Sequence, residues 1–515
     1  MAKKETFIQG AFILVLTSVF VRFVGMFFRI YLSRTIGAEG MGLYQLIFSV
    51  YSLMCTVATA GISVAVTRLV AEKQATMAQS AMRGAVQISL MVAAVCGFGS
   101  MAIMYFGAQP IAMHWLKDLR AFEPLRILSF GLPAMAFTAV YRGYFVAIRR
   151  VSVQSGSQIT EQLLRMAVIF IGLSQVAKGD VTGACVAVVV GNVVSEIAAA
   201  IYVVVSFYQQ KPMLEKAGRN ARRGLMPDFL QVMVPVALAG YTKSFLHTVE
   251  NTLVPGRLGQ FLGSGKLALA EFGVLKGMAM PIIMFPSAFL VAVAMLLVPE
   301  ISEDMAAGRE EHMQKTIGWA LHLTIFVSIL IALLFVVLAR PISNLLYQNE
   351  QVAFYIKVLG PVLPFMYLES ITEGLLRGVN QQASSMRYTL MDSAMRIILI
   401  IILVPNMGMK GFLFIMLVSN LFTSVLNLNK LISTSKVKVN WLRWVAMPVG
   451  AAFICSVPAV RIVAMADTAG APYILQIIAG GAAGGVCYLI ICLLLGCFTK
   501  NEYGALKRLV LKKKV

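Results

Sequence analysis

The hydrophobic positions of this chain form long runs, each ended by a short polar stretch. Most runs reach the about 20 residues that an α-helix needs to cross a hydrocarbon core of about 30 Å. None shows the roughly ten-residue alternation of a transmembrane barrel strand. The pattern predicts an all-α polytopic membrane protein. Its fourteen expected transmembrane helices lie at about 6–35, 41–70, 80–107, 122–148, 155–177, 181–209, 226–251, 270–297, 313–340, 352–378, 384–405, 410–433, 441–463 and 472–498.

Composition agrees with a membrane protein and argues against a nucleic-acid partner. Hydrophobic residues make up 59% of the 515 positions and charged residues 13%, about half the charged share of a soluble protein. The net charge of +21 comes mostly from Lys and Arg in alternate connections between the apolar runs, as the positive-inside rule describes. We therefore expect both termini in the cytoplasm, and contacts with membrane lipids instead of nucleic acid.

The cysteines predict neither a metal site nor a disulfide, and the first residues do not predict a cleaved signal peptide. All seven cysteines lie in apolar runs, without a CxxC pair. We expect them to be small buried hydrophobes, and neither metal ligands nor disulfides. Lys3 and Lys4 before an apolar run imitate a signal peptide. The run is too long for one and carries arginines, so we expect it to remain as the first helix.

Two parts of the chain repeat each other. Pro133 and Arg165 have the same spacing as Pro364 and Arg396, and an acid lies one helical turn before each arginine. Each copy belongs to a set of six expected helices, and because six is even, both sets enter the membrane in the same direction. This predicts parallel repeats. The expected domains are a six-helix lobe at 1–209, a cytoplasmic linker at 210–225, a second six-helix lobe at 226–433, and two extra helices with a basic tail at 434–515.

Two arginines lie inside the first apolar run. Arg22 and Arg29 are two helical turns apart and therefore point to one side. A charge at mid-membrane depth costs about 2.5–3.5 kcal/mol on insertion scales, so it must face protein or water. A guanidinium stays charged and forms paired hydrogen bonds with phosphate oxygens. We expect Arg22 and Arg29 to bind an anionic substrate in a wet, cationic cavity.

Other apolar runs carry charges as well. Glu161 is one helical turn from Arg165, and Asp392 is one turn from Arg396. Such spacing is typical of ion pairs, so we expect both to be structural. Lys276 and Arg142 are further candidates for binding the substrate.

We expect no cofactor, and only H⁺ or Na⁺ as a coupling ion. Glu369 and Glu373 are candidates to bind that ion, as are His247 and Glu250 in the seventh run. A histidine is a candidate because it titrates near neutral pH. For Glu373 an ion pair with Arg377 is the alternative, and for His247 and Glu250 it is a cluster of polar groups that bond one another.

Motifs of membrane enzymes are absent from the sequence. It contains no HExxH and no GxSxG, and Gly265-Lys266 lacks the Ser or Thr and the upstream glycine of a phosphate loop. A glycan polymerase or ligase would need a large outer loop for its chemistry. The longest expected outer loop, at about 114–123, is too short for that. We therefore expect a transporter and not an enzyme.

The first 75 residues also carry a family motif. It begins with Arg22-Phe-Val-Gly25, continues from Arg29 through RTIGAEGMGLYQ at 34–45, and ends with AGISVAVTRLVAE at 60–72. These segments resemble the stage V sporulation protein B group and the related lipid II flippases. Both belong to the polysaccharide transporter branch of the multidrug/oligosaccharidyl-lipid/polysaccharide (MOP) exporter superfamily. The length and the number of expected helices are compatible with this branch.

The resemblance implies a function in the bacterial cytoplasmic membrane. It implies two lobes around a central cavity, alternating access, and a monomer that exports an undecaprenyl-pyrophosphate-linked oligosaccharide or a peptidoglycan precursor. Arg22 and Lys276 resemble basic cavity residues of lipid II flippases, whereas Arg29 stands one residue beyond the second arginine expected. The two extra helices imply a groove for the lipid tail. The alternative within the superfamily is a cation-coupled multidrug exporter, against which the cationic first helix argues.

Overall fold

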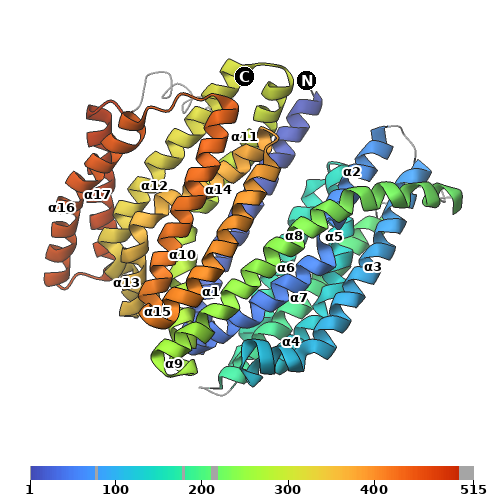
Figure 1. Cartoon of the computed structure of the whole chain (residues 1–515), viewed down its shortest axis with the longest axis horizontal. Helices are drawn as coiled ribbons and strands as arrows, with labels where there is room; N and C mark the ends of the chain where they lie inside the picture. Colours follow the sequence, from blue (N-terminus) through green and yellow to red (C-terminus); the bar gives the residue numbers. More distant parts are fainter. Residues whose placement is uncertain (1, 76–78, 177–179, 210–218, 498–515) are drawn as a thin grey trace. The chain divides into compact units, whose positions relative to one another are not determined.

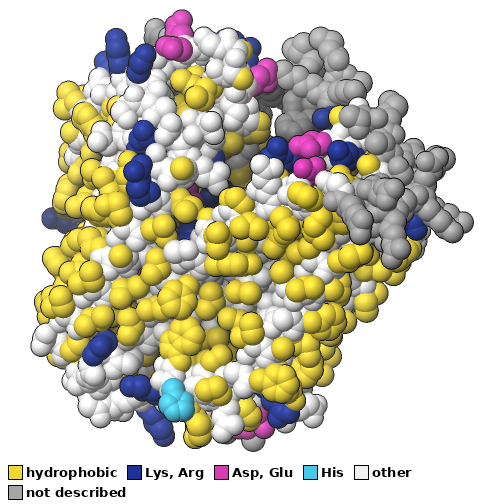
Figure 2. Space-filling view, turned by 45° about the vertical axis from the view of Figure 1, so that its right-hand side comes forward, with side chains coloured by type: hydrophobic (Ala, Val, Ile, Leu, Met, Phe, Trp, Pro, Cys, Tyr) yellow, Lys and Arg dark blue, Asp and Glu magenta, His cyan; other side chains and the backbone are white. Residues whose placement is uncertain are grey.

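The computed structural model describes residues 2–75, 79–176, 180–209 and 219–497. All regular elements in these ranges are helices, which confirms the predicted all-α fold. Ten of the described helices are long and apolar enough to cross a membrane, or eleven if the bent pair 119–129 and 131–147 counts as one span. Many hydrophobic side chains are exposed on the face seen in Figure 2, as expected of helices that meet lipid. The chain is a multi-pass membrane protein.

The helices form two compact units, and the first runs to Gly273 and includes Ile397–Gly408. Within it, α5 packs against α2, α3 and α7, and α6 packs against α1 and α7. Its helices, labelled in Figure 1 where there is room, are α1 (Ala2–Thr59), α2 (Ile62–Ala75), α3 (Gln79–Pro110), η1 (Ile111–Leu116), η2 (Leu119–Ala121), α4 (Phe122–Ser129), α5 (Gly131–Ala147), α6 (Val151–Ser174), α7 (Val181–Gln209), α8 (Arg219–Leu262) and α9 (Gly265–Phe272).

The second unit contains Val274–Arg396 and the described residues from Met409 onward. Here α12 packs against α11, α13, α14, α16 and α17. The helices of this unit are η3 (Gly273–Ala279), α10 (Met280–Met284), α11 (Ser287–Ala306), α12 (Glu310–Leu346), α13 (Glu350–Leu359), η4 (Gly360–Val362), α14 (Leu363–Gly378), most of α15 (Gln382–Ser435), η5 (Leu442–Ala446), α16 (Met447–Thr468) and α17 (Tyr473–Leu494).

Two helices are too long for one crossing, and each breaks at a glycine. α1 has 58 residues and α15 has 54, so each would extend about 80–90 Å if straight, nearly three times the hydrocarbon core. The breaks lie at Gly37 (φ 71°) and Gly408 (φ 59°). Glycine adopts positive φ readily because it has no Cβ. α15 therefore contains two of the predicted spans, whereas α1 contains the first span and most of the second, which ends in α2.

The fourteen predicted segments all fall on helices. The ten candidate spans and the bent pair account for thirteen of them, because Ile13–Ala75 and Gln382–Ser435 contain two each. The remaining segment is α6, whose first half is polar and whose middle carries Glu161 and Arg165. The arrangement as twelve helices plus two stays a prediction.

One predicted segment, 270–297, is irregular. The π-helical η3 interrupts it first, α10 then ends at Met284, and α11 begins at Ser287. Proline lacks the N–H that would continue the helical hydrogen bonds. Pro281 accordingly stands at the start of α10, and Pro286 separates α10 from α11.

The division between the compact units falls after Gly273 and not in the expected linker at 210–225. Residues 210–218 of that linker, like the basic tail at 498–515, lie outside the described residues. The helix that follows the linker, α8, packs against α1, α2 and α3 in the first unit. The lobe boundaries at 209 and 226 therefore stay a prediction from the repeat.

Candidate functional site

The first half of α1 carries Arg22 and Arg29 alongside α6. A Cβ built on Gly25, between the two arginines, would lie 3.7 Å from Nε2 of Gln162. Gln162 directly follows Glu161 in the sequence. The arginine-bearing part of α1 and the charged part of α6 therefore lie side by side within the first unit.

Arg22 is exposed and Arg29 is half-buried. Neither forms an ion pair with an acidic side chain in the described ranges of the chain. An arginine in a membrane-spanning helix that lacks an acidic partner needs water or a ligand around it. Both guanidinium groups are therefore available to an anion.

A second group of charges joins α5 and α6. Arg142 donates hydrogen bonds of 2.8 Å to Oε2 of Glu161 and to Oγ of Ser157. Arg165 donates to Oε1 of Glu161 at 2.5 Å, so the structure forms the predicted Glu161–Arg165 pair. Arg142 was expected to bind substrate, but its guanidinium is engaged by α6. The two arginines and one carboxylate of this cluster leave one positive charge in excess.

A buried carboxyl group lies on α7. Glu196 is only 5% exposed, and the Tyr51 hydroxyl donates to its Oε2 at 2.5 Å. Gly131 leaves the space for it, because a Cβ there would lie 2.1 Å from that oxygen. Tyr51 is 145 residues from Glu196, so no sequence spacing could have revealed the pair. The one available signal was an acid in an apolar run.

A cluster of partly buried charges lies at the break in α1. Arg120 pairs with Glu39, just beyond Gly37, and with Asp118, at 2.7 Å in each case. Asp118 and Arg120 lie in the connection between α3 and α4. The cluster therefore ties the middle of α1 to that connection.

In the second unit, Lys276 lies on the π-helical η3. Its Nζ is 5.6 Å from the centre of the Phe412 ring, within the range of a cation–π interaction. π-Helical turns are frequent at functional sites, because the extra residue changes the direction of a side chain. The structure therefore places this candidate, half-buried, on an irregular turn.

The predicted ion pair of α15 is also formed. Asp392 is 1% exposed and accepts hydrogen bonds from Arg396 at 2.9 Å and from the Ser419 hydroxyl at 2.6 Å. The buried carboxylate is therefore hydrogen-bonded by both partners, as buried polar groups usually are. The pair forms at the predicted spacing, and its structural role stays a prediction.

The two repeats carry opposite charges at one position. Arg142 follows Pro133 at the same distance as Glu373 follows Pro364. Glu373 accepts a hydrogen bond from Arg377 at 2.8 Å. This ion pair is the one that the sequence offered as the alternative to ion binding by Glu373. The first repeat thus presents an arginine where the second presents an acid.

The coupling-ion candidates lie in different units. His247 and Glu250 are on α8, where His247 is exposed and close to Asn251 (Nδ1 to Nδ2, 3.2 Å) and Glu250 is buried. Glu369 and Glu373 are half-buried on α14. In the part of the chain that the structure describes, no three His, Cys, Asp or Glu side chains gather as metal ligands, and all seven cysteines are free thiols.

Comparison with known proteins identifies the family. Residues 7–305 match the family described as polysaccharide biosynthesis protein, and residues 244–402 match the MatE family. The first match covers more than half of the chain. The chain therefore belongs to the polysaccharide biosynthesis protein family, in the polysaccharide transporter branch of the MOP superfamily that its opening motif indicates.

Individual relatives agree with this assignment. The chain is 25% identical over 415 residues to stage V sporulation protein B of Bacillus subtilis, a match that covers 79% of this chain and 80% of that protein. It is 22% identical over 432 residues to the lipid II flippase MurJ of the same organism, and the match covers 78% of each.

Solved structures share the fold. Lipid II flippase MurJ in an inward closed conformation has a TM-score of 0.70 at 15% identity, over 93% of this chain and 98% of that chain. A MATE family transporter of the MOP superfamily in an inward-facing conformation has a TM-score of 0.65 at 14% identity, over 82% of this chain and 100% of that chain. The family and fold are those of membrane transporters and not of enzymes.

Proposed function

We propose that this protein is a flippase that moves an undecaprenyl-pyrophosphate-linked oligosaccharide or a peptidoglycan precursor across the bacterial cytoplasmic membrane. The observation that carries the proposal is the pair Arg22 and Arg29 on a membrane-spanning helix, with no ion-pair partner among the described acids. The family match and the lipid II flippase among the relatives support the same substrate class.

The chemistry of the substrate explains the choice of residue. A pyrophosphate carries negative charge on several oxygens, and it loses its hydration when it enters the membrane. Guanidinium groups replace that water with paired, charge-assisted hydrogen bonds. Arg22 and Arg29 supply this contact in the proposal. Lys276, in the second unit, is a separate candidate for binding the substrate.

Arg142 takes a secondary part in this proposal. Glu161 accepts hydrogen bonds from Arg142 and from Arg165, so the cluster attracts an anion less strongly than two unpaired arginines would. Its excess positive charge lies beside the α1 stretch that carries Arg22. The cluster thus favours an anion near α1 while Glu161 holds both arginines in fixed positions.

The transport cycle in this proposal is alternating access by a monomer with both termini in the cytoplasm. The candidates for a coupling H⁺ or Na⁺ in this proposal are Glu369 and Glu373 on α14 and His247 and Glu250 on α8. Glu373 also pairs with Arg377. No other cofactor enters the proposal.

The proposal is tested with the purified protein in proteoliposomes. One set contains a fluorescent undecaprenyl-pyrophosphate-linked saccharide, and the other is given a fluorescent cationic drug. We expect the labelled lipid to become accessible on the opposite leaflet faster than in protein-free vesicles, and no transport of the drug. Drug transport without lipid translocation would instead establish the alternative, a cation-coupled multidrug exporter.

A further inference from the structure

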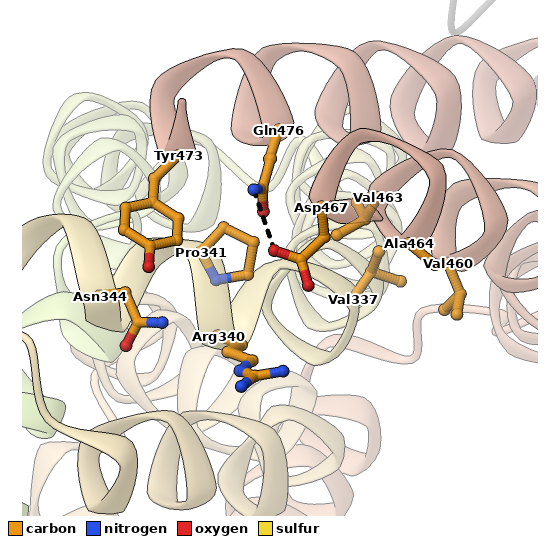
Figure 3. Close-up of a pocket in the computed structure, with 10 residues that line it drawn as sticks. All are labelled: Val337, Arg340, Pro341, Asn344, Val460, Val463, Ala464, Asp467, Tyr473 and Gln476. Carbon is orange, nitrogen blue, oxygen red and sulfur yellow. Dashed lines mark hydrogen bonds between the residues drawn. The ribbon is translucent and has the colours of Figure 1, made fainter. Parts of the chain in front are cut away.

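A pocket of about 270 Å³ lies in the second unit, and none of the residues discussed above lines it. It is formed where α12 and α16 end and α17 begins (Figure 3). The ends of membrane-spanning helices lie at the depth of the lipid headgroups. Tyr473, the first residue of α17, lines the pocket, and tyrosine is enriched at that depth. The pocket therefore lies where a headgroup would be.

The polar wall of the pocket holds one cation and one anion. Arg340 comes from α12 and Asp467 from α16, with the amide of Asn344 and the hydroxyl of Tyr473 on the other side of Pro341 (Figure 3). The Arg340 side chain is 70% exposed, and its nearest acidic partner, Glu350, is 3.6 Å away. That distance is beyond hydrogen-bonding range. The guanidinium can therefore accept another anionic partner.

The carboxylate is held in place by a buried amide. Gln476 is 3% exposed, and its Nε2 donates to Oδ1 of Asp467 at 3.2 Å and to the carbonyl oxygen of Ala471 at 3.0 Å. Both amide hydrogens are thus used. Among the described residues no partner binds Oδ2 of Asp467. A positioned acceptor therefore remains for a donor that enters the pocket.

An apolar wall leads from this polar end onto the lipid-facing surface. Val337, Val460 and Val463 line the pocket. Val460 is also 51% exposed. The same face of α16 continues toward the start of the helix through Val457 and Phe453, which are 54% and 73% exposed. Exposed apolar side chains on a membrane helix are the natural contact of an acyl chain.

We propose that this pocket binds phosphatidylethanolamine. The lipid phosphate pairs with Arg340, its ammonium group donates to Asp467, and an acyl chain follows Val460 along α16. The separate cation and anion of the walls match a zwitterionic headgroup. An anionic headgroup without an amine is repelled by the Asp467 carboxylate. Phosphatidylcholine has no N–H group that could donate a hydrogen bond to that carboxylate. The site is independent of the transported substrate.

The test measures lipid binding and not transport. The full-length protein is purified in detergent, delipidated, and titrated with short-chain phosphatidylethanolamine, phosphatidylcholine or phosphatidylglycerol, with native mass spectrometry as the readout. We expect the wild type to bind phosphatidylethanolamine at least fivefold more tightly than the other two lipids. Arg340→Gln weakens all phospholipid binding, whereas Asp467→Asn removes the preference over phosphatidylcholine.

The matched control is Lys357→Gln, which removes an exposed cation of α13 that does not line the pocket. It is expected to bind like the wild type, and circular dichroism confirms that each variant is folded. Equal binding of the three lipids by the wild type overturns the proposal. So does unchanged phosphatidylethanolamine binding in folded Arg340→Gln and Asp467→Asn.

Discussion

At the scale of single residues, the membrane helices carry two kinds of charged side chain: some form ion pairs, and others have no acidic partner among the described residues. Glu161 and Arg165 could be predicted as a pair because one helix fixes their spacing. The addition of Arg142 could not, because it depends on how α5 packs against α6. The bond from Tyr51 to Glu196 likewise joins helices far apart in sequence. Sequence spacing reveals contacts within a helix, and packing decides the contacts between helices.

Removal of the charge of Glu161 tests whether its cluster stabilises the fold. Glu161→Gln leaves Arg142 and Arg165 together without their carboxylate, and all three side chains are only 22–23% exposed. Because charged hydrogen bonds are lost and two like charges remain, we expect the free energy of unfolding to fall by about 1–3 kcal/mol. The measurement is a melting curve of the purified protein in detergent.

The control for that variant is Glu72→Gln on α2. It removes the acid of another ion pair whose two members are one helical turn apart. The Arg68–Glu72 pair is 64% and 51% exposed, and such exposed pairs contribute about 0–1 kcal/mol. A melting curve of Glu161→Gln that matches the control would show that the cluster has no structural role.

At the scale of the helices, glycines allow two helices to cross at a short distance. A Cβ on Gly42 would lie 2.0 Å from the backbone oxygen of Leu269, so α1 passes α9 at a distance that only glycine permits. The same part of α1 meets Gly273 of the first unit, where a Cβ would lie 2.1 Å from the backbone oxygen of Ala38. These contacts fix the second half of α1 within the first unit.

Gly42→Ala is therefore expected to destabilise the protein. The nearest atom is backbone, which cannot move aside as a flexible side chain does, and overpacking of this kind costs about 1–3 kcal/mol. Gly99→Ala is the matched control, because Gly99 is an exposed helical glycine with no neighbour within 4 Å. We expect lower yield and a lower melting temperature for Gly42→Ala alone. Equal melting of the two variants would contradict the close crossing.

The helical segments themselves could largely be predicted, because apolar length and polar punctuation are local properties of the chain. The breaks at Gly37 and Gly408 each fall between two predicted spans. The π-helical η3 at Lys276 could not be predicted. No periodicity in the sequence records the change from α-helical to π-helical hydrogen bonds there.

At the scale of the whole molecule, the chain combines the fold of a MOP transporter with arginines on its first membrane helix. The fold alone is shared with multidrug transporters, so it does not select the substrate. Arg22 and Arg29 select it in our account, because an anionic headgroup needs fixed positive charge to replace its water. The central claim is therefore that these two side chains bind the substrate phosphate groups.

The most direct test is the initial rate at which the Arg22→Gln, Arg29→Gln double variant translocates an undecaprenyl-pyrophosphate-linked saccharide in proteoliposomes. Loss of charged hydrogen bonds of about 1.5–3 kcal/mol predicts a rate at least about tenfold below wild type, with the melting temperature unchanged. The control Arg68→Gln, in the exposed pair of α2, is predicted to keep the wild-type rate. A double variant that translocates the lipid as fast as the wild type would contradict the account.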